Sequence, residues 1–178
     1  MLQHYDDWGG PTTYPHMAAG WAVAGDSPFA WTKQIPSSYG GTRNGMIVSW
    51  PKGIKAAGQV RSQWHHVIDV APTVLAAAGL QAPAGMQGQD VAPLYRAVTP
   101  PPAWRTEFFY EHPTVTNKNR IPTSQGVIRR DWKYIEWPEF GFQQLFDLQH
   151  DPGEIRNLAG QPAQASLELR MRQQLEEW

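Results

Sequence analysis

The stretch WTKQIPSSYGGTR, residues 31–43, joins a lysine to a glycine pair through a short polar loop. The ammonium of Lys33 could neutralise a sulfate or phosphate as a point charge, and Gly40-Gly41 would let the backbone approach such a ligand. The nucleotide-binding pattern G-x-x-x-x-G-K-[ST] is absent. The stretch therefore indicates either an anion-binding lysine or an exposed lysine before an ordinary glycine turn.

Three histidines raise the question of a metal or pocket site. His65-His66 precede Asp69, but adjacent histidines point to different faces of a helix or strand, and Asp69 is better placed as a helix N-cap. Structural roles are thus favoured for these residues. His16 lies in a tyrosine-containing loop and is a candidate pocket residue, because loops often carry function, with a surface histidine as the alternative.

Carboxylates offer two further sets, each with a simpler explanation. The segment LFDLQHDPGE places Asp147, Asp151 and Glu154 in a loose resemblance to a cation loop, but an Asp-Pro-Gly turn accounts for it. Asp6-Asp7 could face a metal ion or could simply be solvated. The sequence therefore presents no nucleophile–base pair and no cluster of acids that would complete an active site.

Aromatic residues are abundant, with nine tryptophans, and could line a sugar site or a core. The stripe Trp132, Tyr134 and Trp137 allows both interpretations, and core packing of a small sheet is favoured. The net charge of −1, from 15 basic and 16 acidic residues, gives no footprint for nucleic acid. The absence of cysteine excludes disulfides, thiolate metal sites and a cysteine nucleophile. No apolar run reaches the roughly 20 residues of a membrane helix, and the compartment stays unknown.

The elements of the first half indicate the tail of an α/β sheet. Residues 1–32 show no sustained period and predict a long loop region. Met46–Trp50 is β-branched and aromatic and ends at Pro51, which predicts a buried strand. A helix is expected after Asp69, with Pro72 in its first turn and Gly79 as its stop.

The second half predicts a small antiparallel sheet covered by a helix. Strands are expected at 106–112, on both sides of a turn near Arg130-Asp131, and before the Asp-Pro-Gly turn. An amphipathic helix should follow, since Leu167, Met171, Leu175 and Trp178 repeat with helical spacing. The predicted organisation is a catalytic-type α/β part at 1–80, a Pro-rich linker at 81–104 and a C-terminal subdomain at 105–178.

Three stretches in this order resemble the late part of the sulfatase family, specifically its arylsulfatase-like members. They are YPHMAAGWAVAGDSPFAWTKQIPSSYGGTRNGMIVSWP, VRSQWHHVIDVAPTVLAAAGL and WKYIEW…LFDLQHDPGEIRNLAG. The resemblance covers almost the whole chain. It implies an alkaline-phosphatase-like α/β fold and hydrolysis of sulfate esters with a formylglycine, made from a C/S-x-P-x-R motif, and a divalent cation, usually calcium.

Carried over by position, the resemblance places Lys33 against the sulfate as a catalytic residue and puts Tyr14 and His16 in the loop near the substrate pocket. The C/S-x-P-x-R motif and the Asp-Asn metal motif are missing, and Ser38 stands where many relatives have a nearby histidine. We therefore expect a C-terminal sulfatase portion that begins at an internal methionine, retains no cofactor, meets its sulfate ester through a missing N-terminal half and is inactive alone. A non-enzymatic module that binds sulfated glycans and a complementing subunit are the alternatives.

Overall fold

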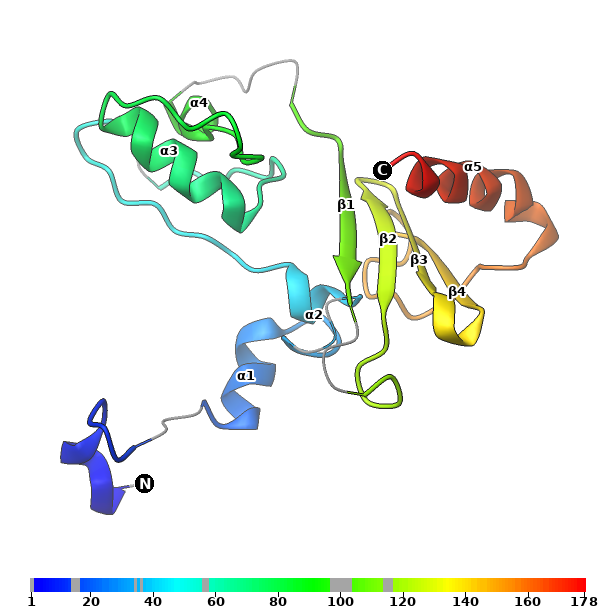
Figure 1. Ribbon diagram of the computed structural model, residues 1–178, viewed down its shortest axis with the longest axis horizontal. Coiled ribbons are helices and arrows are strands. Elements are labelled where there is room, and N and C mark those ends of the chain that lie inside the picture. Colours follow the sequence, from blue (N-terminus) through cyan, green and yellow to red (C-terminus); the bar gives the residue numbers. More distant parts are fainter. Residues whose placement is uncertain are drawn as a thin grey trace. The chain divides into compact units, whose positions relative to one another are not determined.

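The structure is a computed structural model that describes residues 2–13, 17–33, 35, 37–55, 58–96, 104–113 and 117–178 (Figure 1). The chain divides into two compact units. The first joins Met1–Gly45 to Phe109–Trp178, and the second is Met46–Phe108. Among the described residues, no helix is long and apolar enough to cross a membrane. The division of the complete protein into domains remains a prediction.

The first unit is built around a four-stranded sheet whose order follows the sequence. Its strands are β1 (Glu107–His112), β2 (Ser124–Arg129), β3 (Trp132–Trp137) and β4 (Phe142–Asp147). The pairs β2/β3 and β3/β4 are antiparallel. The predicted strand near 106–112 and the hairpin turn near Arg130-Asp131 are confirmed, and the sheet with its helices agrees with the predicted α/β (α+β) class.

One face of this sheet carries a hydrophobic core. The register sets Val127 opposite Tyr134 and Tyr134 opposite Leu145, and all three side chains have no exposed area. Helix α5 (Ala165–Glu176) covers them with Met171 and Leu175, which are 1% and 5% exposed. The predicted amphipathic helix is thus confirmed, because its helical spacing matches an apolar face that the strands present.

The opposite face of the sheet is also buried, and it holds a lysine. Successive strand residues point to opposite faces, so Lys133 lies on the other side of β3 from Tyr134. The register pairs Lys133 with Ile128 and with Phe146, which are 6% and 5% exposed. Lys133 itself has no exposed area, so this face of the sheet contains one buried lysine side chain.

The second unit contains η2 (Val67–Asp69), α3 (Val70–Ala77) and α4 (Ala92–Arg96). Helix α3 ends as expected at Gly79, where φ is +75° and the Leu80 N–H donates to the Leu75 carbonyl. Helix α4 lies inside the segment predicted as a Pro-rich linker. Its residues Ala92 and Leu94 are almost fully buried, so part of this segment is packed.

One prediction about the second unit is wrong. Met46–Trp50 forms no strand, and Ile47 is 98% exposed. A strand requires a neighbour for its N–H and C=O groups, and every strand in the described ranges is already part of the β1–β4 sheet. The helix predicted after Asp69 is confirmed as α3, and its apolar side chains Val70 and Val74 are 42% and 60% exposed.

The long loop predicted for residues 1–32 is also corrected. It contains η1 (Leu2–Asp7) and α1 (Ala19–Asp26), and α2 (Tyr39–Thr42) follows the lysine loop. Helix α1 has no buried residue, so it lacks the apolar period by which a helix is usually detected. Its alanine content favours helix without such a period. Short 3₁₀ turns complete the first unit at η3 (Pro138–Phe140) and η4 (Pro162–Gln164).

Candidate functional site

The loop that carries Lys33 runs from α1 to α2 and is closed by hydrogen bonds of its own backbone. The Gly40 N–H donates to the Ala30 carbonyl at 3.0 Å, and the Ile35 N–H donates to the Thr32 carbonyl at 2.9 Å. Lys33 lies exposed between these closures. An exposed ammonium on a loop with fixed ends is accessible to an anionic ligand.

Gly40 explains how the loop can close so tightly. A Cβ atom at this position would collide with the carbonyl oxygens of Ala30 and Trp31. Trp31 has a φ of 65°, a left-handed conformation that is unfavourable for a bulky side chain. The predicted approach of a ligand to the glycine pair stays a prediction, and at Gly40 the closely approaching group is the protein's own backbone.

A buried ion pair holds the far end of this loop against the sheet. The Tyr39 N–H donates to Glu154 Oε2 at 3.1 Å, and Glu154 Oε1 pairs with Lys133 Nζ. The same ammonium lies 4.4 Å from the centre of the Tyr39 ring, a cation–π distance. Three residues far apart in the sequence thus form one contact network.

Burial sets the electrostatics of this network. The side chain of Lys133 is fully buried and that of Glu154 is 7% exposed. Desolvation lowers the pKa of Lys133, and the Glu154 carboxylate acts in the opposite direction. Desolvation raises the pKa of the Tyr39 phenol, with the negative charge of Glu154 acting in the same direction. Removing either charged partner would leave the other buried without compensation.

Asp69 has a structural role, but not the predicted one. No side-chain cap bond extends from Asp69 to α3. Instead, His66 caps the 3₁₀ turn η2 and Asp69 closes the capping box by accepting the His66 N–H at 2.7 Å. Asp69 also accepts two hydrogen bonds from Arg105, at 2.6 and 3.0 Å, and one from the Gln89 N–H at 2.8 Å.

These donors outweigh the effect of burial on Asp69. Burial alone would raise the pKa of this carboxyl group, but the bonds from Arg105 and from the backbone N–H groups of Gln89 and His66 lower it below 3.8. The structural interpretation of His66 and Asp69 is therefore supported, since both are occupied in fixing the start of a helix.

The remaining carboxylates near β4 are also used internally. Asp147 accepts the N–H groups of Gln149 and His150, and Asp151 accepts those of Ile155 and Arg156. Across the described ranges, no three His, Asp or Glu side chains gather as a metal site would require. The described residues therefore do not fit the calcium ion that the resemblance implies, and no step is assigned to such an ion.

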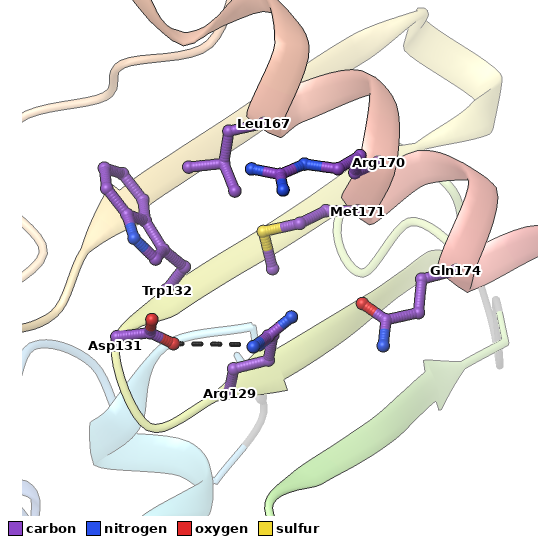
Figure 2. Close-up of a pocket in the computed structure, with 7 residues that line it drawn as sticks. All are labelled: Arg129, Asp131, Trp132, Leu167, Arg170, Met171 and Gln174. Atoms are coloured by element: carbon purple, nitrogen blue, oxygen red, sulfur yellow. Dashed lines mark ion pairs between the residues drawn. The ribbon is translucent and has the colours of Figure 1, made fainter.

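A surface pocket of about 340 Å³ lies where the β2–β3 hairpin meets α5 (Figure 2). Its lining combines two arginines, an aspartate and a glutamine with an indole and two apolar side chains. These residues are Arg129, Asp131, Trp132, Leu167, Arg170, Met171 and Gln174. Asp131 lies 3.7 Å from the Arg129 guanidinium. Figure 2 shows the Arg170 guanidinium extending toward Trp132, so a cation and an aromatic face border the same space.

The predicted site residues have different outcomes. Tyr14 and His16 lie outside the described residues, and their roles stay predictions. Lys33 is exposed on its loop, and its contact with sulfate also stays a prediction. The ion pair of Lys133 with Glu154 was missed, because a lysine in a strand is ordinarily exposed. The available signal was the alternation in WKYIEW, which places Lys133 on the same face as Ile135 and Trp137.

Comparison with known proteins places these features in a family. Residues 38–178 match the family described as N-sulphoglucosamine sulphohydrolase, C-terminal. The chain is 29% identical to an N-acetylglucosamine-6-O-sulfatase of Bacteroides thetaiotaomicron over 134 residues, which cover 74% of this chain and 24% of that protein. It is 31% identical to arylsulfatase K of Danio rerio, covering 70% of this chain and 24% of the relative.

Solved structures agree with these relatives. A protein solved in complex with its substrate D-glucosamine-2-N,6-O-disulfate is 28% identical, with a TM-score of 0.66 over 74% of this chain and 27% of that one. A phosphonate monoester hydrolase from Silicibacter pomeroyi is 26% identical, with a TM-score of 0.57 over 68% of this chain and 26% of that one. The chain spans about a quarter of the length of these proteins.

The family match covers most of the chain and includes the buried Lys133–Glu154 pair, Tyr39 and the Asp69 capping box. The chain therefore belongs to the N-sulphoglucosamine sulphohydrolase C-terminal family and is a C-terminal portion of the sulfatase type.

Proposed function

We propose that this chain is part of a sulfate ester hydrolase and that Lys33 contacts the sulfate group of its substrate. The observation that carries the proposal is the exposed position of Lys33 on a backbone-closed loop in a chain of sulfatase type. An ammonium there would stabilise negative charge on the sulfate and on the leaving oxygen as the S–O bond breaks. The other reacting groups would belong to polypeptide outside these 178 residues.

The substrate class is proposed from the relatives. One relative is named an N-acetylglucosamine-6-O-sulfatase, and one solved neighbour holds D-glucosamine-2-N,6-O-disulfate. These names favour a sulfated sugar over a simple aryl sulfate. A relative from Trinickia caryophylli is described as a multifunctional alkaline phosphatase superfamily protein, and it is 32% identical over 62% of this chain. Because one solved neighbour is a phosphonate monoester hydrolase, a phosphonate monoester is the competing substrate in the test.

The test compares this chain with the longer product of its own gene. We expect an in-frame C/S-x-P-x-R motif upstream, no turnover of 4-nitrophenyl sulfate or glucosamine 6-sulfate by residues 1–178 alone, and turnover of glucosamine 6-sulfate by the longer product. Lys33→Ala should then lower kcat/KM by about 10²–10³-fold, the usual loss for one group that stabilises a charged transition state. Lys52→Ala, which changes another loop lysine, should have little effect.

Other outcomes would contradict the proposal. Turnover by the 178-residue chain alone would show that it needs no further polypeptide. An unchanged kcat/KM in Lys33→Ala would remove this lysine from the site, and a preference for a phenyl phosphonate over glucosamine 6-sulfate would reassign the substrate class.

A second candidate function is recognition of sulfated glycans without hydrolysis, and the pocket in Figure 2 favours it. An indole can stack on a sugar ring, while the guanidinium of Arg170 can bind a sulfate. This function predicts saturable, salt-sensitive binding of a heparin disaccharide to the 178-residue chain, weakened by Arg170→Glu, and no binding of the unsulfated disaccharide. Unchanged binding in Arg170→Glu would remove the pocket from consideration.

A further inference from the structure

The Lys133–Glu154 pair lies in the C-terminal part of the chain, whereas the lysine loop lies near its beginning. We propose that this buried pair, acting through the Tyr39 backbone, is a positioning device for the loop that presents Lys33. This inference rests on the proposed function for the role of Lys33, but the anchoring itself can be tested without any turnover.

The contacts make Glu154 the link between the sheet and the loop. One carboxylate oxygen pairs with the Lys133 ammonium, and the other accepts the Tyr39 N–H at 3.1 Å. Tyr39 is the first residue of α2, directly before Gly40, whose N–H closes the loop onto Ala30. A shift of Glu154 would therefore be transmitted to the closure that fixes the ends of the Lys33 loop.

The chemistry of the pair favours positioning over simple packing. A buried ion pair contributes little net stability compared with well-packed apolar residues, because both charges must leave water. It does impose a direction, since a carboxylate that meets an ammonium on one oxygen presents the other at a fixed angle. Glu154 has a φ of 56°, and Trp31 at the start of the loop has a φ of 65°. Both residues therefore adopt left-handed backbone conformations, which are uncommon for residues other than glycine.

The ring of Tyr39 adds a second contact to the same cation. Lys133 Nζ lies 4.4 Å from its centroid, and the guanidinium of Arg43 lies 5.2 Å from it. Phe29, which precedes the loop, packs edge-on against Tyr39 at 5.6 Å and lies 5.0 Å from the Arg43 guanidinium. Residues before and after Lys33 in the sequence thus contact the Tyr39 ring, which also contacts the ammonium of the buried Lys133.

The discriminating variant is the double substitution Lys133→Met with Glu154→Met in the full chain. It replaces the ion pair with apolar groups, so the sheet can stay packed, but it removes the acceptor for the Tyr39 N–H. Hydrogen–deuterium exchange should accelerate about tenfold at residues 39–43, the scale of one lost hydrogen bond. Exchange in β2–β4 should change far less, and Lys118→Met, which alters an exposed lysine, should change neither region.

Glu154→Gln provides rescue of the contact, because its side-chain oxygen can still accept the Tyr39 N–H. We expect slower exchange at residues 39–43 in this variant than in Glu154→Ala. If the double variant fails to fold, Tyr39→Ala tests the ring contacts from outside the sheet, because it keeps the N–H that donates to Glu154 but removes the ring beside Lys133 and Phe29. Faster exchange should then be confined to residues 31–43. Unchanged exchange at these residues, or equal acceleration in the sheet, would overturn the inference.

In the active longer product, the double variant should raise KM for a sulfate ester more than it lowers kcat, because the loop would sample more orientations before binding. The two proposals fail separately. Faster exchange at residues 39–43 with no effect of Lys33→Ala on turnover would refute the sulfate contact alone. A large effect of Lys33→Ala with unchanged exchange would refute the anchor alone.

Discussion

The sheet with α5 and the unit Met46–Phe108 bury their side chains in different ways. In the sheet, Val127, Tyr134 and Leu145 have no exposed area and pack under Met171 of α5. In Met46–Phe108, many apolar side chains of the predicted strand and of the η2–α3 helix are open to solvent. Their exposed fractions are 98% for Ile47, 77% for Val67 and 60% for Val74.

This difference shows that the apolar side chains of the sheet are covered by other elements of the same unit, whereas many of those in the second unit are not. The strands of the sheet pair with one another, and α5 brings an apolar face of matching spacing. The second unit is organised around a buried polar centre, Asp69 with Arg105, beside the small cluster of Val91, Ala92 and Leu94. Its exposed face fits the proposal that further polypeptide of the complete protein covers it.

The strongest test of this comparison removes the polar centre. Asp69→Asn should destabilise the second unit by about 3–5 kcal/mol, because Arg105 would keep its charge after losing its buried partner. Amide exchange should accelerate in 67–77 and at Gln89, and hardly at all in β2–β4. Asp131→Asn, which breaks an exposed pair at 3.7 Å, is the matched control. Intact protection of the second unit in Asp69→Asn would show that its stability comes from elsewhere.

The corresponding test of the sheet removes one apolar side chain. Met171→Ala should lower the free energy of unfolding of the sheet by about 2–5 kcal/mol, because it leaves a cavity under Tyr134 and Leu145. Leu169→Ala, on the same helix but 55% exposed, should cost much less. Urea denaturation followed by exchange in the strands measures both. Similar losses in the two variants would mean that α5 does not depend on its buried face.

As the pH falls, the second unit should lose its structure before the sheet does. The pKa of Asp69 lies below its ordinary value in the folded state, so its contribution is complete above about pH 4 and is lost as the pH falls through the lowered value. In NMR spectra, signals from 67–96 should therefore lose dispersion before those of β2–β4. In Asp69→Asn, the signals of 67–96 should no longer lose dispersion before those of β2–β4 as the pH falls. Simultaneous loss of dispersion in both regions of the unaltered chain would refute the prediction.

The smallest effect is expected on the exposed face. Val67→Ser with Val74→Ser should change the free energy of unfolding by no more than about 0.5 kcal/mol, because neither side chain is buried. It should reduce the fluorescence of a dye that binds apolar surface and raise solubility. Ala77→Ser on α3 is the control. An unfolding penalty as large as that of Met171→Ala would mean that this face is packed in solution.

Local patterns in the sequence were sufficient for the sheet and its helix. The strand near 106–112, the turn at Arg130-Asp131 and the spacing of Met171 and Leu175 each concern neighbours along the chain, and their partners are close in sequence. The strand predicted at Met46–Trp50 failed for the opposite reason. Its composition suits a strand, but pairing depends on another segment, and none of the described strands pairs with it.

The candidate site was predicted in part. The type and exposed setting of Lys33 follow from a polar loop that ends in glycines, and the family resemblance followed from three ordered motifs. What holds the loop could not be inferred, because Tyr39 and Glu154 are separated by 115 positions. A glutamate after an Asp-Pro-Gly turn is ordinarily solvent-facing, so its sequence context pointed to a turn residue and away from a buried partner for Lys133.

The sequence by itself determined which segments have apolar faces, where turns interrupt them and which family the motifs belong to, because these properties depend on residue type and short spacing. Tertiary structure alone decided which charges are buried and what they hold. Burying Lys133 requires a counter-charge brought from the loop after β4, and the free energy of that contact depends on three-dimensional distance and on exclusion of water.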